Sequence, residues 1–326
     1  MEDKTLLEVK DLTVEFRTLE GTVHAVDGLN YELKAGGTLG IVGESGSGKS
    51  VSSLQIMQLV APAPGNRVSG EILYQGKNLL KCSEKEMQKI RGNDISMIFQ
   101  EPMTSLNPIV TCGKQIAEAL RLHKGLNKKE AMKEATEMMR AVGIANPEQR
   151  AKQYPHQMSG GMRQRIMIAM ALACRPQILI ADEPTTALDV TIQAQILDLM
   201  RDLNEKYKTA IIMITHDLGV VSELCENIVV MYTGQIMEHA TTEQLFKDPL
   251  HPYTKGLLKA IPKIETEKNK LPIIPGMVPN PTEHMDGCSF CPRCDCAMDI
   301  CSKQKPPMVT IGDRKVKCWK YADAKQ

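Results

Sequence analysis

Eight residues near the N-terminus, residues 43–50, read Gly-Glu-Ser-Gly-Ser-Gly-Lys-Ser and fit the spacing G-x-x-x-x-G-K-S. They follow the apolar stretch GTLGIVG, which predicts a buried strand, and precede VSSLQIMQLV, which predicts a helix. Glycines let such a loop turn its backbone N–H groups inward, and the start of a helix adds partial positive charge. The spacing therefore predicts a site for the phosphates of a nucleotide.

Within this loop, Lys49 is expected to reach the β- and γ-phosphates, and the hydroxyl of Ser50 is expected to bind Mg²⁺. A chance glycine-rich loop is the alternative, but the flanking strand and helix argue against it. The loop residues expected to contact the nucleotide are Gly43, Ser45, Gly46, Ser47, Gly48, Lys49, Ser50 and Val51.

A second group of polar residues ends the apolar stretch ILIADEP. Asp182 is placed to hold Mg²⁺, and Glu183 could act as the general base that activates the attacking water. The alternative is a solvated pair of carboxylates at the end of a strand. The apolar run before them and Pro184 after them favour a cleft.

Residues 158–165, MSGGMRQR, narrow the class of nucleotide-binding protein. They resemble the signature of ATP-binding cassette (ABC) subunits, which reads approximately LSGGQ. Three further elements agree in order: Gln100 at the end of DISMIFQ resembles the Q-loop, residues 186–189 (Thr-Ala-Leu-Asp) the D-loop, and His216 in IMITHD the switch histidine.

The resemblance implies a head-to-tail dimer, in which each ATP lies between the phosphate loop of one subunit and the signature of the other. Ser159, Gly160 and Gly161 would then contact the γ-phosphate that the partner binds. His216 would contact the γ-phosphate of its own subunit, and Asp189 would communicate across the dimer.

Two further roles follow from the same resemblance. Gln100 would contribute to Mg²⁺ binding and catalysis. Phe16 would stack on adenine, although a core phenylalanine in an edge strand is the alternative.

Segments away from the phosphates resemble the ATPase subunits of dipeptide and oligopeptide importers, which have nickel importers as relatives. These are QEPMTSLNP, YPHQMSGGMRQR, HPYTKGLL at residues 251–258 and GCSFCPRC. The resemblance implies a second, homologous ATPase subunit in a heterodimer, two transmembrane permease subunits and an extracytoplasmic substrate-binding protein. It places the chain at the cytoplasmic face of the cell membrane, as a peripheral protein.

Six of the ten cysteines crowd between Cys288 and Cys318. In a reducing cytoplasm, such a cluster indicates metal or redox chemistry before disulfides. The resemblance implies that Cys288, Cys294, Cys301 and Cys318 hold a 4Fe–4S cluster, with Zn²⁺ as the first alternative and free thiols as the second. Cys291 and Cys296 leave the choice of four ligands open.

The elements that must position these residues follow from the patterning. The opening segments LLEVKDLTVEF and TVHAVDGLNYEL alternate as half-buried antiparallel strands do, and later helices and strands alternate as in a parallel sheet. We expect an α/β fold: an ABC-type P-loop ATPase with a RecA-like parallel sheet core and an antiparallel β subdomain. The expected domains are the core at 1–100 and 158–245, a helical subdomain at 101–157, and a Cys-rich C-terminal extension at 246–326.

Composition and hydropathy argue against a nucleic-acid partner, a membrane span and a signal peptide. The formal net charge is +1 and aromatic residues make up 4%, so nucleic acid is not an expected partner. No apolar run reaches the roughly 20 residues of a membrane span, and the N-terminus lacks a signal-peptide core. A nickel importer ATPase and a soluble ABC ATPase for DNA repair, translation, iron–sulfur assembly or redox sensing are the alternative functions.

Overall fold

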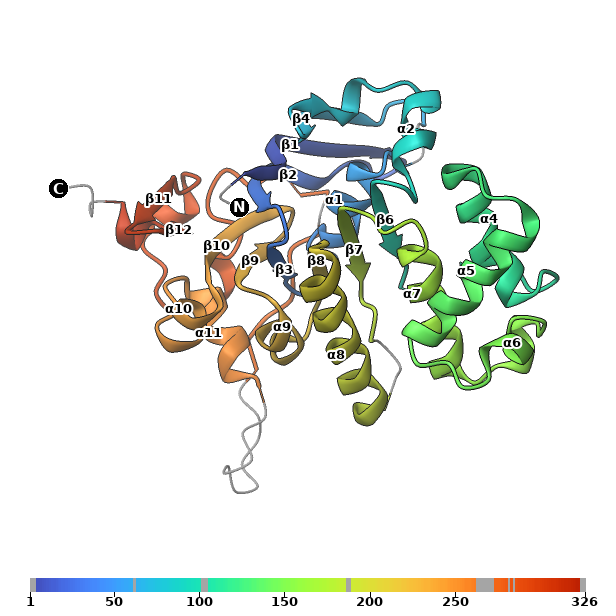
Figure 1. Ribbon diagram of the computed structural model, residues 1–326. Coiled ribbons are helices and arrows are strands. Elements are labelled where there is room, and N and C mark those ends of the chain that lie inside the picture. Colours follow the sequence, from blue (N-terminus) through green and yellow to red (C-terminus); the bar gives the residue numbers. More distant parts are fainter. Residues whose placement is uncertain are drawn as a thin grey trace. The chain divides into compact units, whose positions relative to one another are not determined.

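The structure, a computed structural model, describes residues 4–60, 63–100, 105–185, 189–261, 273–280, 282–283 and 285–322 (Figure 1). The chain divides into two units, each built from segments that are far apart in the sequence. The first unit contains Met1–Thr5, Lys34–Thr38 and Lys81–Ile214, and the second contains Leu6–Leu33, Leu39–Leu80 and Thr215–Gln326.

A four-stranded sheet near the N-terminus has the strand order β2-β1-β4-β5. Its strands are β1 (Thr5–Thr18), β2 (Gly21–Lys34), β4 (Arg67–Tyr74) and β5 (Lys77–Asn78). A bulge between Lys10 and Thr13 shifts the antiparallel pairing of β1 with β4, and the buried positions of β1 change parity across it. These buried positions include Leu7, Val9, Leu12 and Val14. The two opening strands that the alternation predicted are confirmed.

Five further strands of the second unit follow the order β11-β12-β10-β9-β3. Their bounds are β3 (Thr38–Val42), β9 (Asn227–Tyr232), β10 (Gln235–Thr241), β11 (Met308–Ile311) and β12 (Arg314–Lys317). β3 pairs with β9 in parallel, whereas the other neighbours are antiparallel. The C-terminal hairpin β11-β12 thus adds to the edge of β10, with Glu238 opposite Val316.

Short helices accompany these strands. They are α1 (Lys49–Ile56), α9 (Leu218–Leu224), α10 (Thr242–Lys247), α11 (Pro252–Lys259) and the 3₁₀ segments η1 (Leu79–Lys81), η3 (Cys291–Arg293), η4 (Asp299–Ser302) and η5 (Trp319–Tyr321).

The first unit contains three parallel strands in the order β8-β7-β6. They are β6 (Ile95–Ile98), β7 (Ile178–Asp182) and β8 (Ala210–Thr215), and every residue in them is buried. Full burial explains their apolar composition, because a parallel sheet is covered on both faces. Its helices are α2 (Glu84–Ile90), α4 (Cys112–Lys124), α5 (Lys128–Ala141), α6 (Pro147–Arg150), α7 (Gly160–Leu172) and α8 (Val190–Tyr207), with η2 (Pro155–Gln157).

The side chains that cap α5, α7 and α8 accept hydrogen bonds from amides of the first turn. The side chain of Asn127 accepts hydrogen bonds from the amides of Lys129 and Glu130 at the start of α5. Ser159 and Asp189 cap α7 and α8 in the same way. Such caps satisfy amides that a helix leaves free at its N-terminus.

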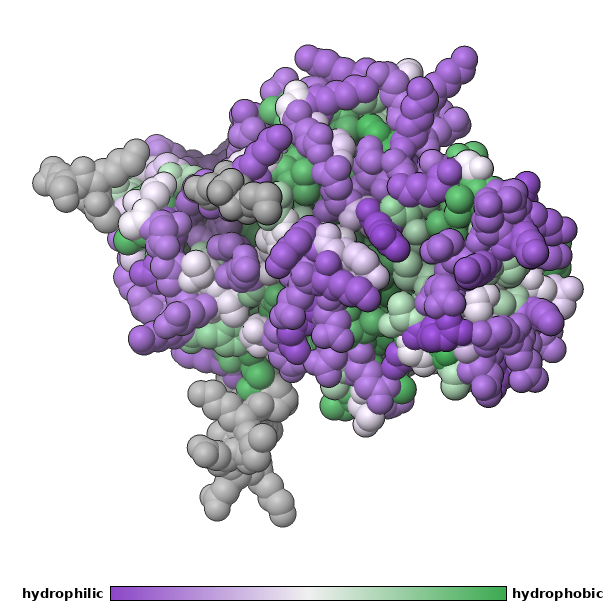
Figure 2. All heavy atoms as spheres, viewed as in Figure 1, coloured by the Kyte–Doolittle hydropathy of each residue, from purple (hydrophilic) through white to green (hydrophobic). Residues whose placement is uncertain are grey.

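Together these features confirm the expected α/β class with parallel strands. None of the helices in the described part of the chain has the length and hydropathy that a membrane span requires. Figure 2 shows that hydrophilic side chains predominate on the face in view and interrupt the hydrophobic ones.

Candidate functional site

The loop between β3 and α1 requires glycine at both ends of its motif. Gly43 has φ 156° and Gly48 has φ 92°, a region that L side chains rarely adopt. A Cβ on Gly43 would lie 2.1 Å from the carbonyl oxygen of Met231, and one on Gly48 would lie 2.2 Å from that of Ala25. Glycine is therefore required at both positions, because two other backbone segments approach the loop so closely.

Lys49 lies inside this loop and is only 6% exposed. Its Nζ donates to the carbonyl oxygens of Gly43 at 2.8 Å and Glu44 at 2.9 Å. A phosphate oxygen is a stronger acceptor than a carbonyl, so a bound phosphate would compete for this ammonium. Ser47 is buried, and Ser50 and Val51 are half-buried in the first turn of α1.

A cavity of about 480 Å³ opens beside the loop within the second unit. Ser45 and Gly46 line it, together with Glu15 of β1 and residues of the C-terminal region. Phe16 is half-buried next to Glu15, and successive side chains of a strand point to opposite faces. Phe16 is not one of the lining residues, so its stacking on adenine stays a prediction.

An ion pair from the C-terminal region lies at this cavity. Lys305 Nζ lies 3.0 Å from Asp27 Oδ2, which also accepts a hydrogen bond of 2.6 Å from Gln235 Nε2. Burial alone would raise the pKa of Asp27, but the hydrogen bond and charge of Lys305 lower it overall. Asp27 is therefore an anion at neutral pH.

Gln100 and Glu183 meet in the first unit. Each follows the end of a parallel strand, and Gln100 Nε2 donates to Glu183 Oε2 at 3.1 Å. The amide of Glu183 donates to the carbonyl oxygen of Ile214 at 2.8 Å, and its φ of 47° is unusual for a residue other than glycine. Asp182, the last residue of β7, is only 5% exposed. The structure thus brings together two of the three predicted catalytic residues.

The signature segment forms the start of α7. Ser159 Oγ accepts a hydrogen bond from the amide of Met162 at 3.3 Å. Gly160 is exposed, and a Cβ on Gly161 would lie 3.3 Å from Ile192 of α8. The free amides of a helix start can bind an anion.

Gln164 is a residue that the sequence reasoning missed. It is buried, and its Nε2 donates to the carbonyl oxygen of Pro184 at 2.5 Å. It therefore connects the signature helix α7 with the segment that carries Glu183. A glutamine within a helix gives no signal of this role in one sequence.

The remaining nucleotide-site residues lie at helix starts. Asp189 Oδ1 accepts from the amide of Ile192 at 2.9 Å, while residues 186–188 of the predicted D-loop lie outside the described residues. His216 is exposed and directly follows β8. The phosphate loop and His216 belong to the second unit, and the other predicted catalytic and signature residues belong to the first.

The six clustered cysteines line one small cavity, together with His251, Phe290 and Trp319. Cys301 is buried, and Cys296 is exposed. Burial raises the pKa of Cys288 to about 11, and the neighbouring thiols add to the shift. Within the described ranges, however, no group of three or more His, Cys, Asp or Glu side chains is arranged to hold a metal ion. The predicted cluster and zinc sites are therefore not supported by this geometry.

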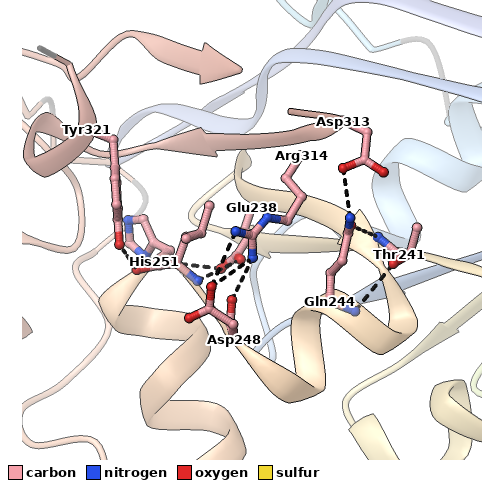
Figure 3. Close-up of polar contacts among 9 residues, drawn as sticks. Glu238, Thr241, Gln244, Asp248, His251, Asp313, Arg314 and Tyr321 are labelled. Atoms are coloured by element: carbon pink, nitrogen blue, oxygen red, sulfur yellow. Dashed lines mark hydrogen bonds and ion pairs between the residues drawn. The ribbon is translucent and has the colours of Figure 1, made fainter. Parts of the chain in front are cut away.

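Polar contacts hold the C-terminal hairpin on α10 and on the residue that follows it (Figure 3). Arg314 of β12 pairs with Asp248 Oδ2 at 3.3 Å, and Gln244 Nε2 donates to Asp313 Oδ1 at 2.7 Å. The hydroxyl of Tyr321 donates to the carbonyl oxygen of Leu250 at 3.1 Å. These contacts connect the residues between Gln244 and Leu250, just before the HPYTKGLL segment, with the C-terminal hairpin and Tyr321.

His251 begins α11 from a fully buried position. The carboxylate of Glu238 accepts the amides of Leu250 and His251 at 2.8 and 2.9 Å, and His251 Nδ1 accepts the amide of Tyr253 at 3.0 Å. Burial lowers the pKa of His251 to about 3, although a hydrogen bond to the backbone of Lys317 opposes the shift. The ring is therefore neutral, with its proton on Nε2.

Comparisons with known proteins agree with this arrangement. Residues 26–186 match the model of the ABC transporter family, and residues 237–301 match that of the oligopeptide/dipeptide transporter C-terminal region. The oligopeptide transport ATP-binding protein AppD of Bacillus subtilis is 53% identical over 320 residues, which cover 98% of each chain. The oligopeptide transport ATP-binding protein OppD of Salmonella typhimurium is 52% identical over 301 residues, 92% of this chain and 89% of that protein.

Solved structures give the same result. A dimeric ATP-binding cassette, MJ0796 bound to ADP and Pi, is 29% identical, with a TM-score of 0.65, and the match covers 72% of this chain and 98% of that chain. The chain is an ATPase and belongs to the ABC transporter ATP-binding subunits, in the group that carries the oligopeptide/dipeptide transporter C-terminal region.

Proposed function

We propose that this ATPase powers the uptake of di- and oligopeptides across the cytoplasmic membrane. The observation that carries the proposal is the close similarity to oligopeptide transport ATP-binding proteins over nearly the whole chain, including the HPYTKGLL segment. The glycine-rich loop between β3 and α1, with the buried Lys49 at the start of the helix, supports a phosphate-binding site.

The proposed reaction is transfer of the γ-phosphoryl group of ATP to water. Lys49 and the loop amides would neutralise the phosphates, and oxygen donors from Ser50 and Asp182 suit Mg²⁺, which would offset charge on the phosphates. Glu183 would accept a proton from the attacking water. The contact of Gln100 with the Glu183 carboxylate supports this role, because it orients the base.

The proposed assembly places Ser159, Gly160 and Gly161 of one subunit on the γ-phosphate of the other, with Asp189 at the junction and His216 on the γ-phosphate of its own subunit. The exposed Gly160 and the half-buried Gly161 at the capped start of α7 support this arrangement, because the start of a helix leaves amides free to bind an anion. We propose a second, homologous ATPase subunit, two transmembrane permeases and an extracytoplasmic substrate-binding protein as partners, at the cytoplasmic face of the membrane. The three domains at 1–100 with 158–245, 101–157 and 246–326 remain part of this proposal.

A 4Fe–4S cluster on Cys288, Cys294, Cys301 and Cys318 completes the proposal. All six clustered cysteines line one cavity together with His251. Four of these thiolates would hold the cluster, since thiolates are the ligands that iron–sulfur clusters prefer. Iron and sulfide analysis of protein purified without oxygen would test it: iron with equal sulfide supports the cluster, and zinc without sulfide contradicts it.

Uptake measurements in the source organism would test the transport function. Deleting the coding sequence should abolish uptake of labelled di- and oligopeptides, and the wild-type chain should restore it, whereas a Glu183→Gln chain should not. Loss of nickel uptake with intact peptide uptake would favour the nickel alternative. Unchanged uptake of both would refute an importer and favour a soluble ATPase.

A further inference from the structure

Glu44, the second residue of the phosphate loop, is held from the C-terminal region by two side chains. Its backbone N–H donates to the hydroxyl oxygen of Tyr253 at 2.9 Å, and its Oε2 accepts from Arg293 Nη1 at 2.8 Å. The carbonyl oxygen of the same residue accepts from Lys49 Nζ at 2.9 Å. One loop residue therefore connects the predicted phosphate-binding lysine with two residues more than two hundred positions away.

Arg293 is fixed by contacts on every side of its guanidinium. Besides Glu44, it donates through Nε to the carbonyl oxygen of Pro275 at 3.0 Å and through Nη2 to that of Ile274 at 3.4 Å. Nη1 also lies 3.3 Å from the hydroxyl of Tyr232. The side chain is 6% exposed, and its planar fork needs little reorganisation to make these bonds.

An aromatic cluster surrounds both side chains that hold Glu44. The rings of Tyr232 and Tyr253 lie 4.7 Å apart, and Phe290, three residues before Arg293, lies 5.4 and 5.3 Å from them. Tyr232 ends β9, which pairs in parallel with β3, the strand that leads into the loop. Burial raises the pKa of Tyr253, so its hydroxyl stays neutral and can accept the amide of Glu44.

A buried arginine–carboxylate pair is weak evidence for stability, because removing both charges from water offsets most of their attraction. Its geometric effect is clearer, since the bonds to Glu44 restrain both the backbone and the side chain of one loop residue. Binding a phosphate to a loop that is already ordered costs less conformational entropy.

We propose that Arg293 and Tyr253 are positioning residues for ATP binding: they hold Glu44, and through it the phosphate loop, in the conformation that receives the phosphates. This inference rests on the proposed nucleotide role of residues 43–50. It gives the C-terminal region a part in the ATPase reaction through its contacts with the phosphate loop.

Binding of Mg-ATP and the KM and kcat of hydrolysis would be measured for the full chain and its variants. Arg293→Met should raise the Kd for ATP about tenfold, and Tyr253→Phe, which removes one oxygen atom, roughly fivefold. The KM should rise with the Kd while kcat stays within about threefold, because these side chains reach ATP only through the loop. The double variant Glu44→Gln/Arg293→Met should have a Kd for ATP little higher than that of Arg293→Met alone. The reason is that each substitution disrupts the same contact between the two side chains.

Arg314→Met is the matched control. It removes another arginine–carboxylate pair of the C-terminal region, with Asp248, and should leave the Kd for ATP unchanged. The inference would be overturned if folded Arg293→Met and Tyr253→Phe bound ATP with the wild-type Kd. It would also be overturned if Arg314→Met raised the Kd for ATP as much as they do. If Arg293→Met does not fold, Tyr253→Phe decides. If the wild-type chain itself failed to bind Mg-ATP, the proposed function would fall instead.

Discussion

Lowering the pH from 7 to 5 is expected to destabilise the second unit through His251. This imidazole is 1% exposed, and its burial lowers the pKa from the ordinary 6.5 to about 3. It caps α11 as a neutral ring, with Nδ1 accepting the amide of Tyr253. Protonation would place a cation in a buried position and add a donor at Nδ1, the atom that now accepts the amide of Tyr253.

The sign of this pH effect follows from the pH at which the folded and the unfolded chain each bind the proton. Between pH 6.5 and 3, the unfolded chain is protonated at this histidine and the folded chain is not. The unfolded state therefore binds more protons, and the free energy of unfolding rises with pH across this window. From pH 7 to pH 5 the shift implies a loss of about 2 kcal/mol from this residue.

Urea unfolding followed by the fluorescence of Trp319, the only tryptophan, reports on the C-terminal part of this unit. His251→Asn is the informative variant, because asparagine can supply a capping oxygen but does not titrate. It should lower stability at pH 7 and reduce the loss between pH 7 and 5 by about 2 kcal/mol. Equal losses for the variant and the wild type would refute the assignment. His239, whose pKa burial lowers to about 4, should act in the same direction in both proteins.

Three further predictions concern the proposed reaction and the cysteines. Glu183→Gln should bind Mg-ATP but hydrolyse it at least about a hundredfold more slowly in single-turnover assays; brisk hydrolysis would remove Glu183 as the base. Lys49→Ala should weaken ATP binding at least about tenfold in equilibrium titrations, and unchanged affinity would contradict its phosphate contacts. Cys301→Ser should lose the visible absorption expected of an iron–sulfur cluster while still binding ATP, and full colour would exclude Cys301 as a ligand.

The local parts of the site could be predicted from the sequence because they depend on neighbouring residues. The loop at Gly43 lies between β3 and α1 as the spacing indicated. Ser159 caps a helix, at a position where serine is preferred. Gln100 and Glu183 meet because both follow strands of one parallel sheet, and parallel strands end at the same edge.

Contacts between distant segments could not be predicted in this way. The pairing of β12 with β10 depends on cross-strand packing, and the short, charged strand Arg314–Lys317 carries little β signal of its own. The buried hydrogen bond from Gln164 to the backbone of Pro184 also could not be predicted from the sequence, since a glutamine inside a helix usually faces solvent.

The HPYTKGLL segment combines a local feature that the sequence predicts with a long-range contact that it does not predict. Its sequence predicts the start of a helix with proline in the first turn, and α11 does begin at Pro252. That description leaves the histidine and the tyrosine unexplained, because a helix start needs neither. The structure gives both a reason: His251 caps the helix from a buried site, and Tyr253 is thereby directed to the amide of Glu44. The motif therefore does more than start a helix, because its tyrosine also contacts the phosphate loop. Only the folded structure brings these distant residues together.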